Sequence, residues 1–214
     1  MSEVNFEIYL KPTRFIDSDN LKVIAYANSL TTPEKSDREK CMDLYYGVRD
    51  GILYDPNHID LRPEAISASH TLERGRGYCV EKSLLLAAIG RVHKIPSRLG
   101  FSIVRNHLST QKFIDMLGSD KFVFHGYNEF WLEGKWVKCT PAFNKSLCDK
   151  FGVAPLEFDG IHDSVFHEYA GGKKYMEYLH DYGQFDDLPF DLFVHELKAH
   201  YPHLFEEGGI ISLA

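Results

Sequence analysis

The chain has 214 residues, of which 44% are hydrophobic and 14% aromatic. A chain of this length and composition can bury one sizeable hydrophobic core, which excludes an intrinsically disordered protein. The formal net charge is -7, and the basic residues are scattered among acidic ones. A nucleic-acid-binding protein needs a clustered basic surface, so we expect no nucleic-acid partner.

Patterns along the chain disfavour several further classes. The first residues lack the charged and then apolar pattern of a signal peptide, and no apolar run approaches the roughly 18 residues of a membrane span. The cysteines, at positions 41, 79, 139 and 148, show no Cys-x-x-Cys spacing, and no histidine pair at i and i+4 flanks a glutamate. We therefore expect a cytoplasmic protein with no membrane partner, no disulfide framework, no metal and no cofactor.

The N-terminal part predicts a strand and two helices. Residues 6–10 alternate as a strand does, and Asp17-Ser18-Asp19 can cap a helix that runs to about Leu30. Thr32-Pro33-Glu34 then begins a second helix. Its residues at i, i+3, i+4, i+7 and i+11 form one stripe that we expect to be buried: Cys41, Leu44, Tyr45, Val48 and Ile52.

A third helix begins at Cys79. The preceding residues 56–70 are irregular, with one short helix at most, and residues 73–78 are rich in glycine. Residues 79–90 consist of helix formers with apolar side chains at spacings of three and four. Cys79 therefore falls in the first turn of a helix that packs on a core, and the flanking glycines allow close approach of a substrate.

The remaining elements include a β-hairpin. Residues 97–104 predict a strand, residues 109–118 a helix closed by glycine, and residues 122–132 and 135–140 the two arms of a hairpin with Glu133-Gly134 as a two-residue turn. The C-terminal third predicts a strand over 173–181 and a helix over 190–200. Nothing resembles a linker, so we expect a single domain over residues 1–214.

Cys79 is a candidate nucleophile. The unpaired N–H groups and the dipole of a helix N-terminus favour a thiolate, and Arg74, Arg76 and Lys82 add positive charge nearby. These features predict a lowered Cys79 pKa. The alternative interpretation is that Cys79 is a small core residue, because free cysteines are often buried.

His125 is the candidate partner of Cys79. With a two-residue turn, Leu132 opposes Lys135 and Tyr127 opposes Thr140. The period of two then places His125 and Thr140 on one face of the sheet, diagonal to each other, together with Tyr127 and Glu129.

Four motifs resemble the transglutaminase-like superfamily in order and spacing. They are Gly75-Arg76-Gly77-Tyr78-Cys79, Ile95-Pro96-Ser97-Arg98, His125-Gly126-Tyr127-Asn128-Glu129 and Gly134-Lys135-Trp136-Val137-Lys138. In that family a Gly-x-Cys motif begins the core helix, and a histidine strand pairs with a Trp-x-x-x-Asp-Pro strand. The motifs span about residues 45–145, and the extension over 146–214 is similar to that of a bacterial branch described as cysteine proteases.

The resemblance implies an α+β fold with a papain-like core, in which the Cys79 helix packs on an antiparallel sheet that carries His125. It implies that Cys79 is the nucleophile and His125 the general base and acid. Thr140 stands where the family carries its aspartate, and threonine cannot supply a negative charge to an imidazolium. Asn144 and Glu129 are the other candidates to orient His125.

The implied activity is cysteine-dependent acyl transfer on peptide or glutamine amides through a Cys79 thioester, with a peptide or protein as substrate. Water as the acceptor would make the protein a protease or amidase, and an amine would make it transglutaminase-like. Because Thr140 replaces the aspartate, a non-catalytic peptide-binding module on the same fold is the alternative.

Overall fold

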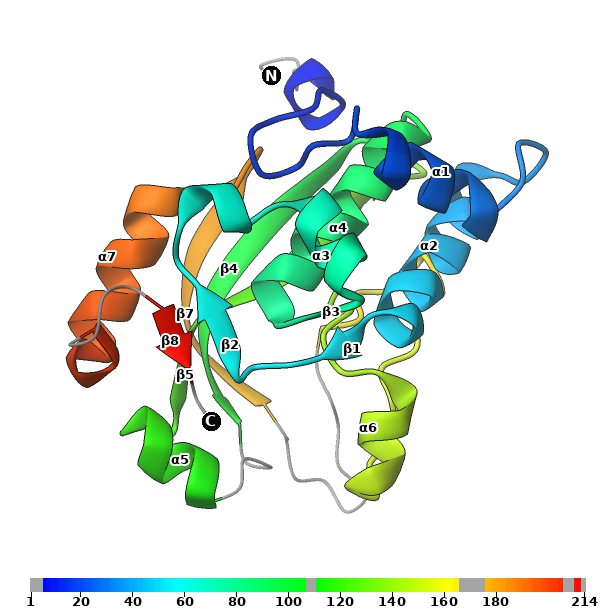
Figure 1. Ribbon diagram of the computed structural model, residues 1–214. Helices are drawn as coiled ribbons and strands as arrows, with labels where there is room; N and C mark the ends of the chain where they lie inside the picture. The colour runs from blue at the N-terminus through cyan, green and yellow to red at the C-terminus, as the bar shows by residue number, and fades with distance from the viewer. Residues whose placement is uncertain (1–5, 107–110, 166–175, 206–209, 213–214) are drawn as a thin grey trace.

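The computed structural model describes residues 6–106, 111–165, 176–205 and 210–212. A four-stranded antiparallel sheet with strand order β6-β5-β4-β7 is its centre. Helices α4 and α3 lie over the sheet, with α1 and α2 beyond them on one side and α7 on the other (Figure 1). In chain order the elements, with η for a 3-10 helix, are η1 (Phe6–Tyr9), α1 (Leu21–Leu30), α2 (Asp37–Gly51), β1 (Leu53–Tyr54), β2 (His58–Asp60), η2 (Pro63–Ala65), α3 (Ala68–Arg74), β3 (Arg76–Gly77), α4 (Cys79–Val92), β4 (Ser97–Asn106), α5 (Gln111–Leu117), β5 (Lys121–Leu132), β6 (Lys135–Cys139), α6 (Lys145–Lys150), β7 (Met176–Phe185), α7 (Phe190–His200), η3 (Pro202–Phe205) and β8 (Ile210–Ser212).

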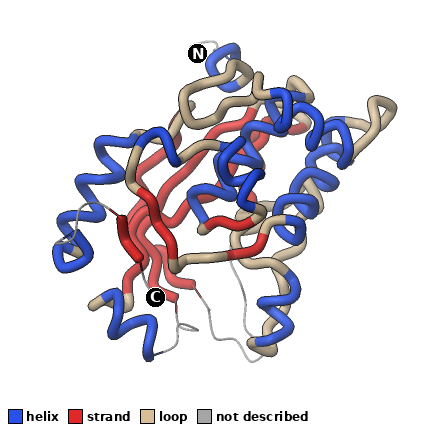
Figure 2. The backbone as a smooth tube through the Cα atoms, viewed as in Figure 1, coloured by secondary structure: helices blue, strands red, loops and turns tan. Residues whose placement is uncertain are grey.

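This arrangement confirms the predicted α+β class. Figure 2 shows the strands gathered behind the helices rather than alternating with them. Two further strand pairs lie outside the main sheet: β1 with β3, which are parallel, and β2 with β8, which are antiparallel. Strand β7 is an edge of the main sheet, so a strand from the C-terminal third completes the sheet. Within the described residues, no helix is long and apolar enough to cross a membrane.

Helix α4 is the centre of the core. Every residue from Val80 to Arg91 is buried, as the apolar run predicts. Gly90 lies so close to β5 that an added Cβ would come within 2.5 Å of a Phe130 ring carbon, and the Asn128 side-chain amide donates to the Ser83 carbonyl at 2.8 Å. The even-numbered residues of β5 around position 128 therefore face α4, and the odd-numbered ones face the opposite side of the sheet.

The hairpin has the predicted register. Leu132 pairs with Lys135 and Asn128 with Cys139. The turn residues Glu133 and Gly134 have φ angles of 50° and 85°. Positive φ at both positions is the requirement of a type I′ turn, which twists the two arms in the sense of the sheet.

Several elements in the first half differ from their predictions. Residues 6–9 form a 3-10 helix rather than a strand, because Phe6 packs on Trp131 and Tyr9 on Trp136, with ring centroids 4.8 and 5.2 Å apart. A side-chain spacing of three suits a 3-10 turn.

Two helix starts also differ. Asn20 rather than Asp17-Ser18-Asp19 caps α1, since the Asp17 carboxylate accepts from the Ser69 N–H instead. Helix α2 begins at Asp37, not near Thr32, because Ser36 and Glu39 make reciprocal capping hydrogen bonds there. The stripe from Cys41 to Ile52 is buried as predicted.

The later elements follow the predictions closely. Strand β4 and helix α7 are confirmed, α7 with the predicted bounds. Helix α5 is present over Gln111–Leu117, and the predicted capping residues Ser109 and Thr110 lie outside the described residues. Strand β7 begins at Met176, and the first predicted strand residues, 173–175, also lie outside the described part of the chain.

Candidate active site

The glycine-rich stretch before Cys79 turns the chain from one helix into the next. Gly75 ends α3 in the left-handed conformation, with φ of 62°. A Cβ on Gly77 would lie 2.9 Å from a carboxylate oxygen of Glu81, which accepts from the Tyr78 N–H at 3.2 Å. These two glycines therefore shape the turn that leads into α4. The sequence predicted only that they allow close approach of a substrate.

Cys79 is the first residue of α4 and differs in exposure from the other thiols. All four cysteines are free, but Cys41, Cys139 and Cys148 are buried, whereas Cys79 is partly exposed. Backbone N–H groups of Cys79, Val80 and Gly126 donate toward the Cys79 sulfur, and each lowers its pKa. The sulfur thus lies in a nest of main-chain N–H donors.

Gly126, the residue after His125, brings β5 against the start of α4. A Cβ on Gly126 would lie 3.1 Å from the Val80 Cα and 3.3 Å from the Cys79 carbonyl oxygen. By the alternation of an antiparallel pair, the Gly126 N–H points toward β6, but β6 ends at Cys139. The Cys79 sulfur accepts a hydrogen bond from this N–H beyond the end of β6.

A β-bulge leads into His125, which is itself buried. The pairing of β4 with β5 shifts by one residue there, and Phe124 has φ of 61°, a region that side chains other than glycine rarely adopt. The Phe124 ring stacks on Phe101, with centroids 4.6 Å apart. It also contacts the rings of Tyr182 on β7 and Phe193 on α7. This packing holds a strained backbone that sets the direction of His125.

The predicted lowering of the Cys79 pKa is wrong in direction. Burial of the sulfur raises its pKa from the ordinary 9.0 to about 11, in spite of the three N–H donors. Desolvation penalises the charged thiolate more than these donors stabilise it. The negative charge of Glu81 raises the Cys79 pKa further.

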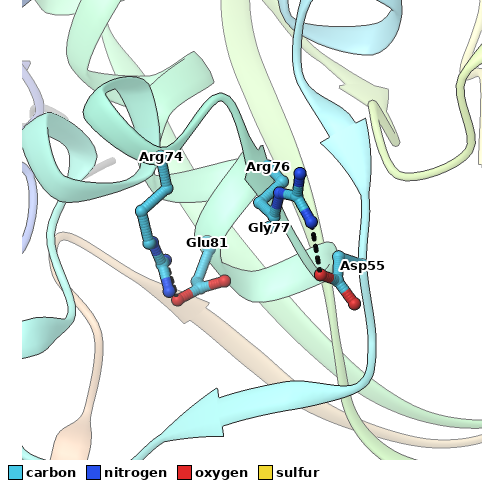
Figure 3. Close-up of a pocket in the computed structure, with 5 residues that line it drawn as sticks. All are labelled: Asp55, Arg74, Arg76, Gly77 and Glu81. Carbon is cyan, nitrogen blue, oxygen red and sulfur yellow. Dashed lines mark hydrogen bonds and ion pairs between the residues drawn. The ribbon is translucent and has the colours of Figure 1, made fainter.

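The three basic residues expected to activate Cys79 are all engaged elsewhere. Arg74 pairs with the Glu81 carboxylate, and Arg76 lies 3.6 Å from Asp55, which the parallel β1–β3 pair brings alongside (Figure 3). These residues and Gly77 line a cavity of about 320 Å³. The carboxylates cancel the field that the two guanidinium groups would otherwise exert on the thiol.

Lys82 is buried beneath the site as a structural residue. Its Nζ donates to the carbonyl oxygens of Arg49 and Ile52 at 2.9 and 2.6 Å, at the C-terminal end of α2. Burial lowers the Lys82 pKa to about 7. Its role is to satisfy the last carbonyls of α2, which a sequence pattern could not show.

The candidates for the third residue have different partners. Thr140 follows β6 and is buried; its main-chain N–H donates to the Ser164 carbonyl at 3.0 Å, but its hydroxyl has no hydrogen-bond partner among the described residues. The Asn144 amide accepts from the Tyr54 N–H at 3.1 Å and donates to the Ser146 hydroxyl at 2.8 Å.

Glu129, although on the face of His125, is ion-paired. Its carboxylate pairs with Arg98 and lies 3.7 Å from the Lys138 ammonium. Two cations therefore hold the Glu129 charge at the far end of the hairpin, which leaves Thr140 as the candidate nearest to the end of β6.

Tyrosines around Cys79 are site residues that the sequence did not single out. Burial raises the pKa of Tyr54, Tyr178 and Tyr201, which come from β1, β7 and the end of α7, and the neighbouring Cys79 contributes to each rise. Their elements converge only in the folded chain, so no local motif marks them. Among the described residues, no three histidine, cysteine or carboxylate side chains gather closely enough to hold a metal ion.

A cysteine-bearing helix packed on an antiparallel sheet, with a histidine strand against its first turn, defines a papain-like core. The chain matches the family model described as the transglutaminase-like superfamily over residues 24–141, more than half of its length. It belongs to the transglutaminase-like superfamily, as its motifs predict. The matched region contains Cys79, His125 and Thr140 and ends before Asn144.

Solved structures give weaker similarities. One is a "Putative Cysteine Protease" from Cytophaga hutchinsonii, with a TM-score of 0.48 and 20% identity over 62% of this chain and 40% of that one. Another is a "putative protease" from Parabacteroides distasonis, with a TM-score of 0.39 and 15% identity over 55% of this chain and 22% of that one. The chain thus spans less than half the length of either protein. No curated protein matches the chain.

Proposed function

We propose that the protein is a cysteine-dependent acyl-transfer enzyme that acts on peptide or glutamine amides through a thioester on Cys79. One observation carries this proposal. Cys79 is the partly exposed thiol among four, and its sulfur lies at a helix N-terminus against the Gly126 N–H, one residue from His125. Its cytoplasmic location, its bacterial origin and the extent of its domain over residues 1–214 stay predictions.

The raised pKa of Cys79 dictates how the nucleophile is generated. A thiol with a pKa of about 11 is protonated at neutral pH, so His125 removes its proton as the sulfur attacks the carbonyl carbon. The amide carbonyl oxygen becomes an oxyanion, and the N–H groups of Cys79 and Gly126 are the donors within reach of it. His125 then protonates the departing ammonia or amine, and water or an amine resolves the thioester.

The Thr140 hydroxyl, which has no hydrogen-bond partner among the described residues, is the proposed group that orients His125, and it adds no charge. Loss of the triad carboxylate lowers the rate of a serine enzyme by about 10⁴. If Thr140 stands at the aspartate position, Thr140→Asp raises kcat/KM by at least about tenfold, and Thr140→Val lowers it. Asn144 remains a second proposed orienting residue, with a role through the loop that it ties to Tyr54.

The second candidate function is a non-catalytic peptide-binding module. It is favoured by Thr140 at the aspartate position and by a Cys79 thiol that is protonated in the free protein. Such a module would bind peptides without releasing amine or forming a thioester.

The test compares Cys79→Ala with Cys148→Ala, which removes a buried thiol on α6. Ammonia and amine release from glutamine-containing peptides are measured, together with the mass of any acyl-enzyme, and circular dichroism checks folding. We expect Cys79→Ala to fold and to lose activity and the acyl adduct, while Cys148→Ala keeps both. Peptide binding by the wild type without turnover would select the binding module, and full activity in Cys79→Ala would place the nucleophile elsewhere.

A further inference from the structure

A second cavity lies on the face of the sheet opposite α4. Its volume is about 340 Å³, and its polar and aromatic lining consists of Ser102, Tyr127, Lys138, Asp163, Tyr178, His180 and Asp181. Strands β4, β5, β6 and β7 all contribute, together with the segment that follows α6. The cavity is therefore built on the rigid sheet and not on one loop.

This cavity adjoins His125. Ser102 is the cross-strand partner of His125, and Tyr127 is two residues further along the same face, about 6.6 Å away at the strand rise. Tyr178 connects the cavity to the segment beside Thr140, since its hydroxyl donates to the Val165 carbonyl at 3.0 Å and the neighbouring Ser164 carbonyl accepts from the Thr140 N–H at 3.0 Å. A substrate residue bound here would lie beside the acyl group at Cys79.

The charges of the lining favour a cation. The carboxylates of Asp163 and Asp181 are exposed, and Asp181 accepts from the Tyr127 hydroxyl at 3.4 Å. The one lysine of the lining, Lys138, already has a counter-charge, because its Nζ is 3.7 Å from Glu129, which lies outside the cavity. Because Glu129 also pairs with Arg98, the two cations and the three carboxylates together leave one net negative charge for a ligand.

The Tyr127 ring lines the cavity. The Tyr127 side chain is 1% exposed, and its ring lies flat over Gly100, where an added Cβ would come within 2.1 Å of a ring carbon. The Lys138 ammonium lies 5.1 Å from the centroid of the same ring. The buried Tyr127 ring therefore forms a fixed wall of the cavity, and its hydroxyl holds the Asp181 carboxylate in place.

Ser102 supplies an independent sign of a ligand. It is 1% exposed and lines the cavity, yet among the described residues its hydroxyl has no hydrogen-bond partner. A buried hydroxyl without a partner is unfavourable, because nothing compensates for its lost hydration. An ammonium or guanidinium donor in the cavity would satisfy it.

We propose that this cavity binds the basic side chain of a peptide substrate, so that the preferred substrate carries lysine or arginine beside the residue whose acyl group Cys79 attacks. A lysine side chain reaches about 6 Å from Cα to Nζ, which matches the step from His125 to Tyr127. This role rests on the proposed function, because only an enzyme has a substrate. Binding of the basic side chain itself does not require turnover.

The binding experiment uses the Cys79→Ala protein and fluorescein-labelled blocked peptides of sequence Gly-X-Gln-X-Gly. X is lysine, norleucine or glutamate, so lysine and norleucine differ only in the terminal ammonium group. We expect the lysine peptide to bind at least about tenfold more tightly than the norleucine peptide by fluorescence anisotropy, because the carboxylates attract its ammonium group. Raising the salt concentration should reduce this preference.

Asp181→Asn, added to Cys79→Ala, should abolish most of the preference while keeping an acceptor oxygen for Tyr127. Asp191→Asn, at an exposed carboxylate on α7, is the matched control and should keep the preference. Equal binding of the lysine and norleucine peptides, or tighter binding of the glutamate peptide, would overturn the proposal. Absence of turnover in the wild type with the binding preference intact would instead overturn the proposed function alone.

Discussion

The reactivity of Cys79 in the free protein should be that of an unactivated thiol. Burial raises its pKa from 9.0 to about 11. At pH 7 only about one thiol in 10⁴ is then ionised, which is about a hundredfold less thiolate than an ordinary cysteine has. The helix N-terminus alone predicts the opposite, so the pH at which Cys79 ionises decides whether desolvation or the main-chain donors dominate.

The assay is alkylation by iodoacetamide from pH 6 to 10.5, with the extent at each cysteine read by mass spectrometry. The rate at Cys79 should rise about tenfold per pH unit up to about pH 10, whereas an N-acetylcysteine amide reference levels off near pH 9. Access to the thiol scales the rate equally at every pH, so the absence of a plateau up to pH 10.5 would report the raised pKa alone. The buried thiols of Cys41, Cys139 and Cys148 should react more slowly throughout.

Two substitutions separate the causes. Glu81→Gln removes a negative charge that raises the Cys79 pKa, so the curve should move to lower pH. His125→Ala should leave the curve unchanged, because His125 acts as a base only during attack. A wild-type plateau below pH 8.5 that disappears in His125→Ala would refute this reasoning, since it would show a thiolate paired with an imidazolium before substrate binds.

Three further predictions concern the packing that holds the site. Gly126→Ala places a Cβ 3.1 Å from the Val80 Cα and should lower the free energy of unfolding by about 1–3 kcal/mol and also reduce turnover; an unchanged urea midpoint would contradict the close approach. Gly100→Ala collides with the Tyr127 ring at 2.1 Å and should cost about 3 kcal/mol, which thermal unfolding would show. Burial raises the Glu81 pKa from 4.5 to about 7, so between these pH values the folded state binds a proton that the unfolded state has lost. The free energy of unfolding should therefore fall by up to about 3 kcal/mol as the pH rises through this window. Glu81→Gln should remove this pH dependence.

Local patterns predicted most of the regular elements. The stripe from Cys41 to Ile52, the apolar run after Cys79 and the Glu133-Gly134 turn each encode their element within a few residues, and the structure has all three. The strand predicted for residues 6–10 was wrong, because the residues that they pack on, Trp131 and Trp136, are more than 120 positions away in the sequence. A short alternating segment takes the conformation that its distant contacts select.

The sequence by itself determined the family, the helix that presents Cys79 and the hairpin that carries His125, since motif order and side-chain period are properties of neighbouring residues. Only the tertiary structure decided the electrostatics of the site. Arg74, Arg76 and Lys82 are close to Cys79 along the chain, but each meets a carboxylate or carbonyl from another element and none remains to lower the Cys79 pKa. The effect of a neighbouring charge on a cysteine pKa depends on the burial of the thiol and on the counter-charges around both groups. Both are set by the fold.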